Sequence, residues 1–354
     1  MRLYNRELEQ IQNAERENRI QEIAEKNILF LVEKYGIDED FLKKRLEKLS
    51  VVERKGKTHF VIQNGEKFEI NSNAPASFVT KKDMEFDGNK WSFENAVYTS
   101  DNNGNHTITH ELFHFLAGNT EMDFDTNGIG YDKRGVSIDG YDREDGKVDV
   151  GMQASGLNEG ITEMLAMEVD GMDAPATYDS QVYLAAILVN SQDNALINAY
   201  FSEDSKNFKK FLEDFDTRQS VTSSKKLVSL STISDGVIDI ELLKGCLEYS
   251  LSFCQNMEQL TNERKRLLPI FKSMSMSNGL NIEFSDENFD VKDFFSDMMS
   301  TKRQEIQERS KSVQELGKES LLELQETSYI DDTQQNIVLQ EKINENHKGT
   351  VQGL

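Results

Sequence analysis

The chain has 354 residues, with 40 Lys and Arg against 63 Asp and Glu, and its formal net charge is −23. A field of this size and sign repels phosphate backbones and anionic lipid, so nucleic acids and membranes are excluded as expected partners. The longest strictly apolar runs, residues 182–189 and 28–32, are far shorter than the roughly 20 residues that a membrane-spanning helix needs. We therefore expect a soluble protein.

The N-terminal segment is charged from Arg2 onward and lacks an apolar stretch followed by a small-residue cleavage site. This absence of a standard secretory signal predicts a cytoplasmic protein, while export without a removable signal stays open. Cys246 and Cys254 stand eight positions apart on what reads as one helix, which separates them by about 12 Å of rise. That distance excludes a disulfide between them.

The first elements along the chain are two helices. Apolar residues recur at helical spacing among dense charges over residues 3–35, and Gly36 stands where a helix C-cap belongs. Asp38 and the acidic residues after it are typical of the first turn of a second helix. We predict that the two helices pack as an N-terminal helical hairpin over residues 1–50. The first helix lacks a strict heptad, which favours packing onto its own protein, although dimerisation through it stays open.

The next region favours strands. Residues 51–70 are rich in β-formers around Asn64-Gly65, a pair typical of a two-residue hairpin turn. A further strand is predicted at residues 96–100, and a second hairpin at 135–150 that turns at Asp145-Gly146. With its helices, the region 51–219 is expected to be an α+β core with a small mixed or antiparallel sheet.

After a loop that contains Pro175, nearly all of the chain has helical spacing. Residues 220–340 are expected to form a C-terminal helical region. Its first residues, 220–230, are rich in Ser, Thr and Lys and are interpreted as a linker, whereas the polar residues 341–354 are expected to be disordered. The helices are predicted at residues 182–189, 196–201, 208–215, 238–253 and 258–274.

The sequence HELFH at residues 110–114 is an HExxH pentapeptide within a predicted helix over residues 107–116. Residues four apart share one helix face, so His110 and His114 can both reach one metal ion. Glu111, one position on, can hold a water in the open coordination position of that ion. The pattern arises by chance in about one such sequence in a hundred, and the alternative is a polar helix face with two solvated histidines.

A second motif, NEGITE, occupies residues 158–163 at the start of another predicted helix. Glu159 and Glu163 share a face of that helix, and Glu159 follows His114 by 45 residues. The pair supplies a carboxylate ligand for a metal and a second carboxylate that can accept the outer N–H of a ligating histidine.

Together, HELFH and NEGITE resemble the signature of the gluzincin branch of zinc metallopeptidases, as in thermolysin-like and lethal-factor-like enzymes, over about residues 95–200. The resemblance implies a zincin-like core in which His110, His114 and Glu159 hold Zn²⁺. It further implies that Glu111 is the general base and that Glu163, with Asn158 at the start of the motif, supports the ligands. The metzincin pattern is excluded, because Ala117 and Thr120 replace its glycine and third histidine.

A hydroxyl or imidazole that stabilises the transition state is harder to assign. The candidates are Tyr178 and Tyr183, just after the second motif, and Tyr131 and Tyr141 between the motifs. We favour Tyr178 as a catalytic residue. The strand at residues 96–100 is expected to hold an extended substrate by edge-strand pairing.

Two weaker signals remain. His106 stands one turn before His110, but three histidines on consecutive turns span about 12 Å, so His106 is expected to cap or frame the helix start rather than bind the metal. Residues 123–128 match the first half of an EF-hand loop, yet Arg134 stands where the bidentate glutamate belongs. We expect a turn there, and calcium binding near residues 123–127 stays open.

The sequence therefore predicts a zinc-dependent endopeptidase that acts on a peptide or protein substrate. One alternative is a noncatalytic interaction protein that keeps the zincin fold, and another is an exported effector or toxin protease. Cleavage specificity and oligomeric state do not follow from the sequence.

Overall fold

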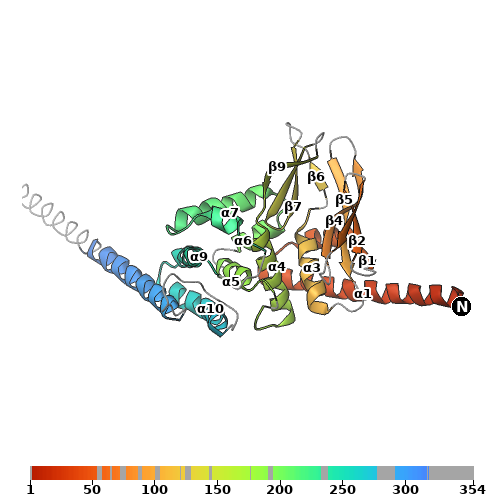
Figure 1. Ribbon diagram of the computed structural model, residues 1–354. Coiled ribbons are helices and arrows are strands. Elements are labelled where there is room, and N and C mark those ends of the chain that lie inside the picture. Colours follow the sequence, from red (N-terminus) through yellow and green to blue (C-terminus); the bar gives the residue numbers. More distant parts are fainter. Residues whose placement is uncertain are drawn as a thin grey trace, which may run out of the picture.

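In the residues that the structure describes, helices combine with three small sheets, which confirms the α+β class (Figure 1). No helix in the described part of the chain is both long and apolar enough to cross a membrane. The computed structural model describes residues 2–53, 58–63, 66–71, 77–86, 90–99, 104–119, 121–123, 129–142, 146–175, 177–189, 194–232, 238–276, 292–316 and 318.

The two N-terminal helices are present where the sequence predicts them. Helix α1 (Arg2–Tyr35) ends at Gly36, whose φ of +67° is the left-handed conformation that glycine adopts without strain. Helix α2 (Glu39–Leu46) begins after Asp38, whose side chain accepts the backbone N–H of Phe41. The second half of α1 packs against α3 and α4, while its N-terminal end extends beyond the sheet (Figure 1).

The largest sheet leads directly into the first motif. It contains β1 (Leu49–Glu53), β4 (Ser77–Phe86), β5 (Lys90–Thr99) and β6 (Glu121–Asp123). Strand β5 lies in the middle, parallel to β1 and antiparallel to β4 and β6. The predicted strand at residues 96–100 is thus the end of β5.

This topology corrects the expected substrate strand. Ala96 of β5 pairs with Ser50 of β1 on one side and with Val79 of β4 on the other. Its backbone groups are therefore already used, and edge-strand pairing of a substrate with residues 96–99 is wrong. The expectation failed because β4 has a polar sequence that did not read as a strand.

Two smaller sheets account for the predicted hairpins. Strands β2 (Thr58–Gln63) and β3 (Glu66–Asn71) are antiparallel, and the expected turn at Asn64-Gly65 lies outside the described residues. The second hairpin corresponds to β8 (Ser137–Asp142) and β9 (Gly146–Met152), to which β7 (Ile129–Arg134) adds a strand that was not predicted. Residues 124–128 of the EF-hand half-match also lie outside the described residues.

The motifs lie on two helices that pack against each other, α3 (Asn105–Ala117) and α4 (Ser155–Asp170). Helix α4 starts three residues earlier than predicted and ends at Gly171, again in the left-handed conformation with φ +67°. The remaining described helices are α5 (Asp179–Leu188), α6 (Ala195–Phe201), α7 (Ser205–Arg218), α8 (Ser224–Val228), α9 (Ile240–Ser252), α10 (Met257–Met276) and a helix over residues 292–316. Five of them correspond to the five predicted ones, whereas α8 and the helix over residues 292–316 were not predicted individually.

The segment expected to be a linker, residues 220–230, is instead part of the packed structure. Ser223 caps α8, the side chain of Ser224 bonds to Asp216, and Leu227 is fully buried. Ser and Thr are common in caps as well as in loops, so the composition was misleading. Cys246 and Cys254 are buried free thiols, as their spacing predicted, and residues 341–354 lie outside the described chain.

Candidate metal centre

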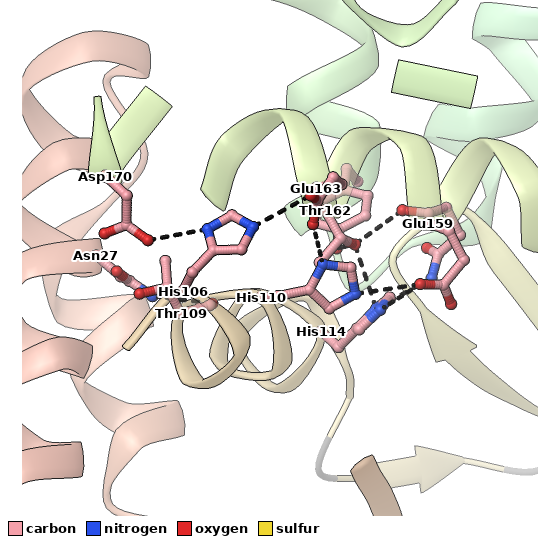
Figure 2. Close-up of polar contacts among 11 residues, drawn as sticks. Asn27, His106, Thr109, His110, His114, Glu159, Thr162, Glu163 and Asp170 are labelled. Atoms are coloured by element: carbon pink, nitrogen blue, oxygen red, sulfur yellow. Dashed lines mark hydrogen bonds and ion pairs between the residues drawn. The ribbon is translucent and has the colours of Figure 1, made fainter. Parts of the chain in front are cut away.

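Three predicted ligands converge between α3 and α4. One nitrogen of His110, one nitrogen of His114 and one carboxylate oxygen of Glu159 all lie within 4.8 Å of one another. Glu159 Oε2 is 3.2 Å from His110 Nε2 and 3.1 Å from His114 Nε2 (Figure 2). A metal ion bound in place of these hydrogen bonds would have two imidazole nitrogens and one carboxylate oxygen as ligands.

The helices hold these side chains rigidly because their other faces are buried. On α3, Ile108, Leu112 and Phe115 are packed in the core. On α4, Gly160 lies so close to α5 that a Cβ there would be 2.4 Å from the backbone oxygen of Gln181. Both imidazoles therefore project from one side of α3 toward α4, whose position is fixed by its close packing against α5.

Glu163 sets the orientation of His110. Its Oε2 lies 2.9 Å from His110 Nδ1 and accepts that N–H, which turns Nε2 toward Glu159. Glu163 is only 2% exposed. Burial alone would raise the pKa of its carboxyl, but hydrogen bonds from His106 and His110 outweigh burial and lower that pKa to about 2. Glu163 is therefore an ionised acceptor at neutral pH.

His114 is held by a separate polar group of residues. Its Nδ1 lies 3.2 Å from Asn158 Nδ2 and 3.2 Å from Thr162 Oγ1. Thr162 donates its own proton to the backbone oxygen of Asn158, so its Oγ1 can accept the N–H of His114 Nδ1. The hydroxyl of Tyr200 lies 2.6 Å from Thr162 Oγ1. In the tautomer in which Nδ1 donates to Thr162, the Nε2 lone pair of His114 is free for a metal.

Glu159 itself is ionised. Burial would raise the pKa of its carboxyl, but the charge of His114 and the hydrogen bonds from both histidines outweigh burial and lower it. For His110, burial would lower the pKa of the imidazole, yet its bonds to Glu159 and Glu163 raise that pKa to about 10. A metal ion binding here would displace this proton.

Tyr178 is the only one of the four tyrosine candidates whose described side chain reaches the centre. Its ring stacks on His110, with centroids 6.0 Å apart and planes 20° from parallel. Burial, followed by the charges of Glu159 and Glu111, raises the pKa of its hydroxyl, so the proton is retained for donation. Tyr178 has φ +58° and ψ +37°, one of two non-glycine residues with positive φ among those described, and such strain concentrates at functional sites.

The other candidates lie elsewhere. The hydroxyl of Tyr183 is buried 2.9 Å from Ser273 Oγ. Tyr131 is 37% exposed on β7, and the side chain of Tyr141 on β8 lies outside the described residues. Glu111 is partly exposed on α3 and close enough to His110 and Tyr178 for its charge to raise the pKa of both.

His106 is placed differently from the expectation. Gly104 is the N-cap of α3, so a capping role for His106 is wrong. Its ring instead faces α4, with Nε2 3.1 Å from Glu163 Oε1 and Nδ1 3.0 Å from Asp170 Oδ2. It lies outside the group of three potential ligands, as the span of the helix requires.

Sequence reasoning missed Thr162, Tyr200 and Asp170. Thr162 lies inside the NEGITE motif, one turn after Asn158, and could have been found from that spacing. Tyr200 and Asp170 carry no local signal. Comparison of the chain with protein-family models, curated proteins and solved structures gives no significant match, so the chemistry has to be argued from these contacts.

Proposed function

We propose that this protein is a zinc-dependent peptidase with a gluzincin-like catalytic core, in which His110, His114 and Glu159 hold Zn²⁺. The observation that carries the proposal is the approach of three ligand atoms to within 4.8 Å from two packed helices. Catalytic zinc sites use three protein ligands of these types and leave one position for water. The donors fit zinc, because Glu163 and Thr162 each engage the outer nitrogen of a histidine.

The chain's own groups then divide the chemistry. Bound zinc lowers the pKa of a water and polarises a carbonyl oxygen. Glu111 stands beside His110 on the partly exposed side of α3, where it can take the proton of the attacking water and pass it to the leaving amine. Tyr178 keeps its proton and can donate a hydrogen bond to the oxygen that becomes negatively charged.

An extended peptide substrate can bind by forming backbone hydrogen bonds with a strand of the protein. In the described part of the chain, β5 is the one strand hydrogen-bonded to β4, and β2 contacts β4 without pairing with it. Strand β4 also contacts α3, which carries both histidine ligands. An extended peptide that paired with β4 would be read mainly through its backbone, as in other cases of strand addition.

The proposal is tested by metal content and cleavage measured on the same preparations. We expect one zinc per chain in the wild type and in Glu111→Gln, and loss of zinc in His110→Ala. Cleavage of a peptide library should occur in the wild type and fall by about 10²–10⁴-fold in Glu111→Gln. Glu213→Gln, an exposed carboxylate on α7, is the matched control and should behave as wild type.

Each failure has a separate meaning. A wild-type protein that contains no zinc after reconstitution near neutral pH would refute the metal centre. Zinc without cleavage of any library peptide, or equal cleavage by Glu111→Gln, would refute the peptidase and favour a noncatalytic interaction protein that keeps the metal.

A further inference from the structure

His106 is bonded on both sides by carboxylates. Its Nε2 lies 3.1 Å from Glu163 Oε1, and its Nδ1 lies 3.0 Å from Asp170 Oδ2 (Figure 2). An ionised carboxylate can only accept hydrogen bonds, so both ring nitrogens donate. His106 is therefore held as an imidazolium between two residues of α4.

The carboxylate of Glu163 uses both of its oxygens in this arrangement. Oε1 accepts from His106 and Oε2 accepts from His110. Because Glu163 is 2% exposed, water has little access to replace a lost partner. Because each oxygen of the carboxylate accepts a hydrogen bond, the group cannot rotate about its Cγ–Cδ bond without breaking one of these hydrogen bonds.

The far end of the chain of contacts is anchored by α1. Asp170 Oδ1 lies 3.3 Å from the ammonium of Lys26, while Asp170 Oδ2 bonds His106. Charges thus alternate from Lys26 through Asp170 and His106 to Glu163, which ends on the metal ligand His110. Each group is held by neighbours of opposite sign, which favours a single arrangement.

We propose that His106 is a positioning residue that, together with Asp170, locks Glu163 in the orientation that directs His110 Nε2 at the metal. The inference rests on the proposed zinc site and goes beyond it, since His106 is neither a ligand nor in contact with one. Without His106, Glu163 keeps His110 as its remaining imidazole partner and can turn away from it. The ligand then has to be ordered when the metal binds, and affinity falls.

The test measures zinc affinity by competition with a chromophoric chelator, together with the visible spectrum of the Co²⁺-substituted protein, which reports ligand geometry. We expect His106→Ala to weaken zinc binding about tenfold, within the range known for residues that support ligands, and to change the Co²⁺ spectrum. Asp170→Asn keeps the shape but removes the charge, and should weaken binding less. His106→Gln, which can still donate one hydrogen bond to Glu163, should restore part of the affinity.

Glu168→Gln is the matched control. Glu168 lies on the same helix as Asp170, and its carboxylate bonds Lys34 and Tyr35 of α1 away from the ligands. If His106 were only a structural contact, His106→Ala and Glu168→Gln would lower the thermal stability of the protein and leave its zinc affinity unchanged.

The outcomes separate this inference from the proposed function. A wild type that binds zinc, with equal affinity in His106→Ala and Asp170→Asn, overturns the positioning role and leaves the metal centre intact. A wild type without zinc affinity overturns both. Should His106→Ala fail to fold, the affinity and Co²⁺ spectrum of Asp170→Asn decide the question.

Discussion

The ring of Tyr178 lies over the imidazole of His110, nearly parallel to it, with 6.0 Å between the ring centroids. The backbone of Tyr178 adopts a left-handed conformation to reach this position, directly before α5 begins. The tyrosine is thus held beside the ligands by the packing of α4 against α5, at a cost in backbone strain of about 1–3 kcal/mol.

Replacing Tyr178 by Phe should distinguish the contribution of its hydroxyl from that of its stacked ring. The stacked ring and the zinc content should be preserved, because the phenyl group can occupy the same place over His110. Loss of a donor to the developing oxyanion should lower kcat by about 10²–10³-fold with little change in KM. Steady-state kinetics on the best library peptide checks this, and an unchanged kcat would remove Tyr178 from the catalytic residues.

Tyr200 is fully buried and contacts the candidate ligands through Thr162. Tyr200→Phe removes the hydroxyl 2.6 Å from Thr162, whose oxygen contacts His114. We expect a loss of about 1 kcal/mol in unfolding free energy and zinc binding weakened ~3–10-fold. Urea unfolding and chelator competition measure the two effects. Tyr249→Phe, which loses a comparable bond to Asp214 far from the ligands, should lower stability and spare zinc affinity.

Gly135 connects β7 and β8 at a place where the site tolerates no side chain. Its φ is +60°, and a Cβ there would lie 2.1 Å from Asn158 Oδ1 and 2.4 Å from the ring of Tyr200. Gly135→Ala should cost more than about 2 kcal/mol, from strain and overlap together, and should weaken zinc binding by displacing Asn158.

The natural comparison is Gly36→Ala. Gly36 has φ +67° but nothing within 4 Å of the added Cβ, so strain alone should cost about 1 kcal/mol. Chemical denaturation of both variants distinguishes the two contributions. Equal losses in the two variants would mean that the turn at Gly135 can move away from Asn158.

The contact between His106 and Glu163 should contribute to stability within a limited pH window. The hydrogen bond to Glu163, opposed by burial, raises the pKa of His106 from 6.5, so its contribution is complete below 6.5 and is lost as the pH rises through the raised value. The pKa of Glu163 is lowered from 4.5 to about 2, so its contribution is complete above 4.5 and is lost as the pH falls through 2.

The two windows overlap between pH 4.5 and 6.5. The difference in unfolding free energy between wild type and His106→Gln, measured in chelator, should therefore be largest near pH 5.5–6 and smaller in alkaline buffer. A difference that grew steadily with rising pH would show that His106 is neutral in the folded protein.

The three potential ligands were accessible to sequence reasoning because helix geometry fixes which residues share a face. HELFH and NEGITE each place two groups four positions apart, and the chemistry of zinc supplies the reason to join the two helices. Glu163 and Asn158 lie inside the NEGITE motif and were predicted as supporting residues, whereas Tyr200 and His106 were not accessible in the same way. Tyr200 sits in an apolar run where a tyrosine usually signals only packing, and the role of His106 depends on Asp170 at the opposite end of another helix.

The strands show a related limit. The hairpin β2–β3 follows from Asn64-Gly65, whereas β4 and β7 are polar strands whose pairing depends on distant partners. The segment 220–230 was misread because a serine that caps a helix and a serine in a linker look alike until the burial of Leu227 is known.

Helix α1 reaches the site helices through several polar contacts. Arg19 bonds the side chain of Asn105 at 2.6 Å, and the buried Asn27 donates to the backbone oxygen of Thr109. Lys26 adds its ion pair with Asp170. The contacts that support the site helices therefore reach back to Arg19, far upstream of the first potential ligand. We therefore expect that cleavage releasing α1 would disturb the candidate centre without touching any of its three potential ligands.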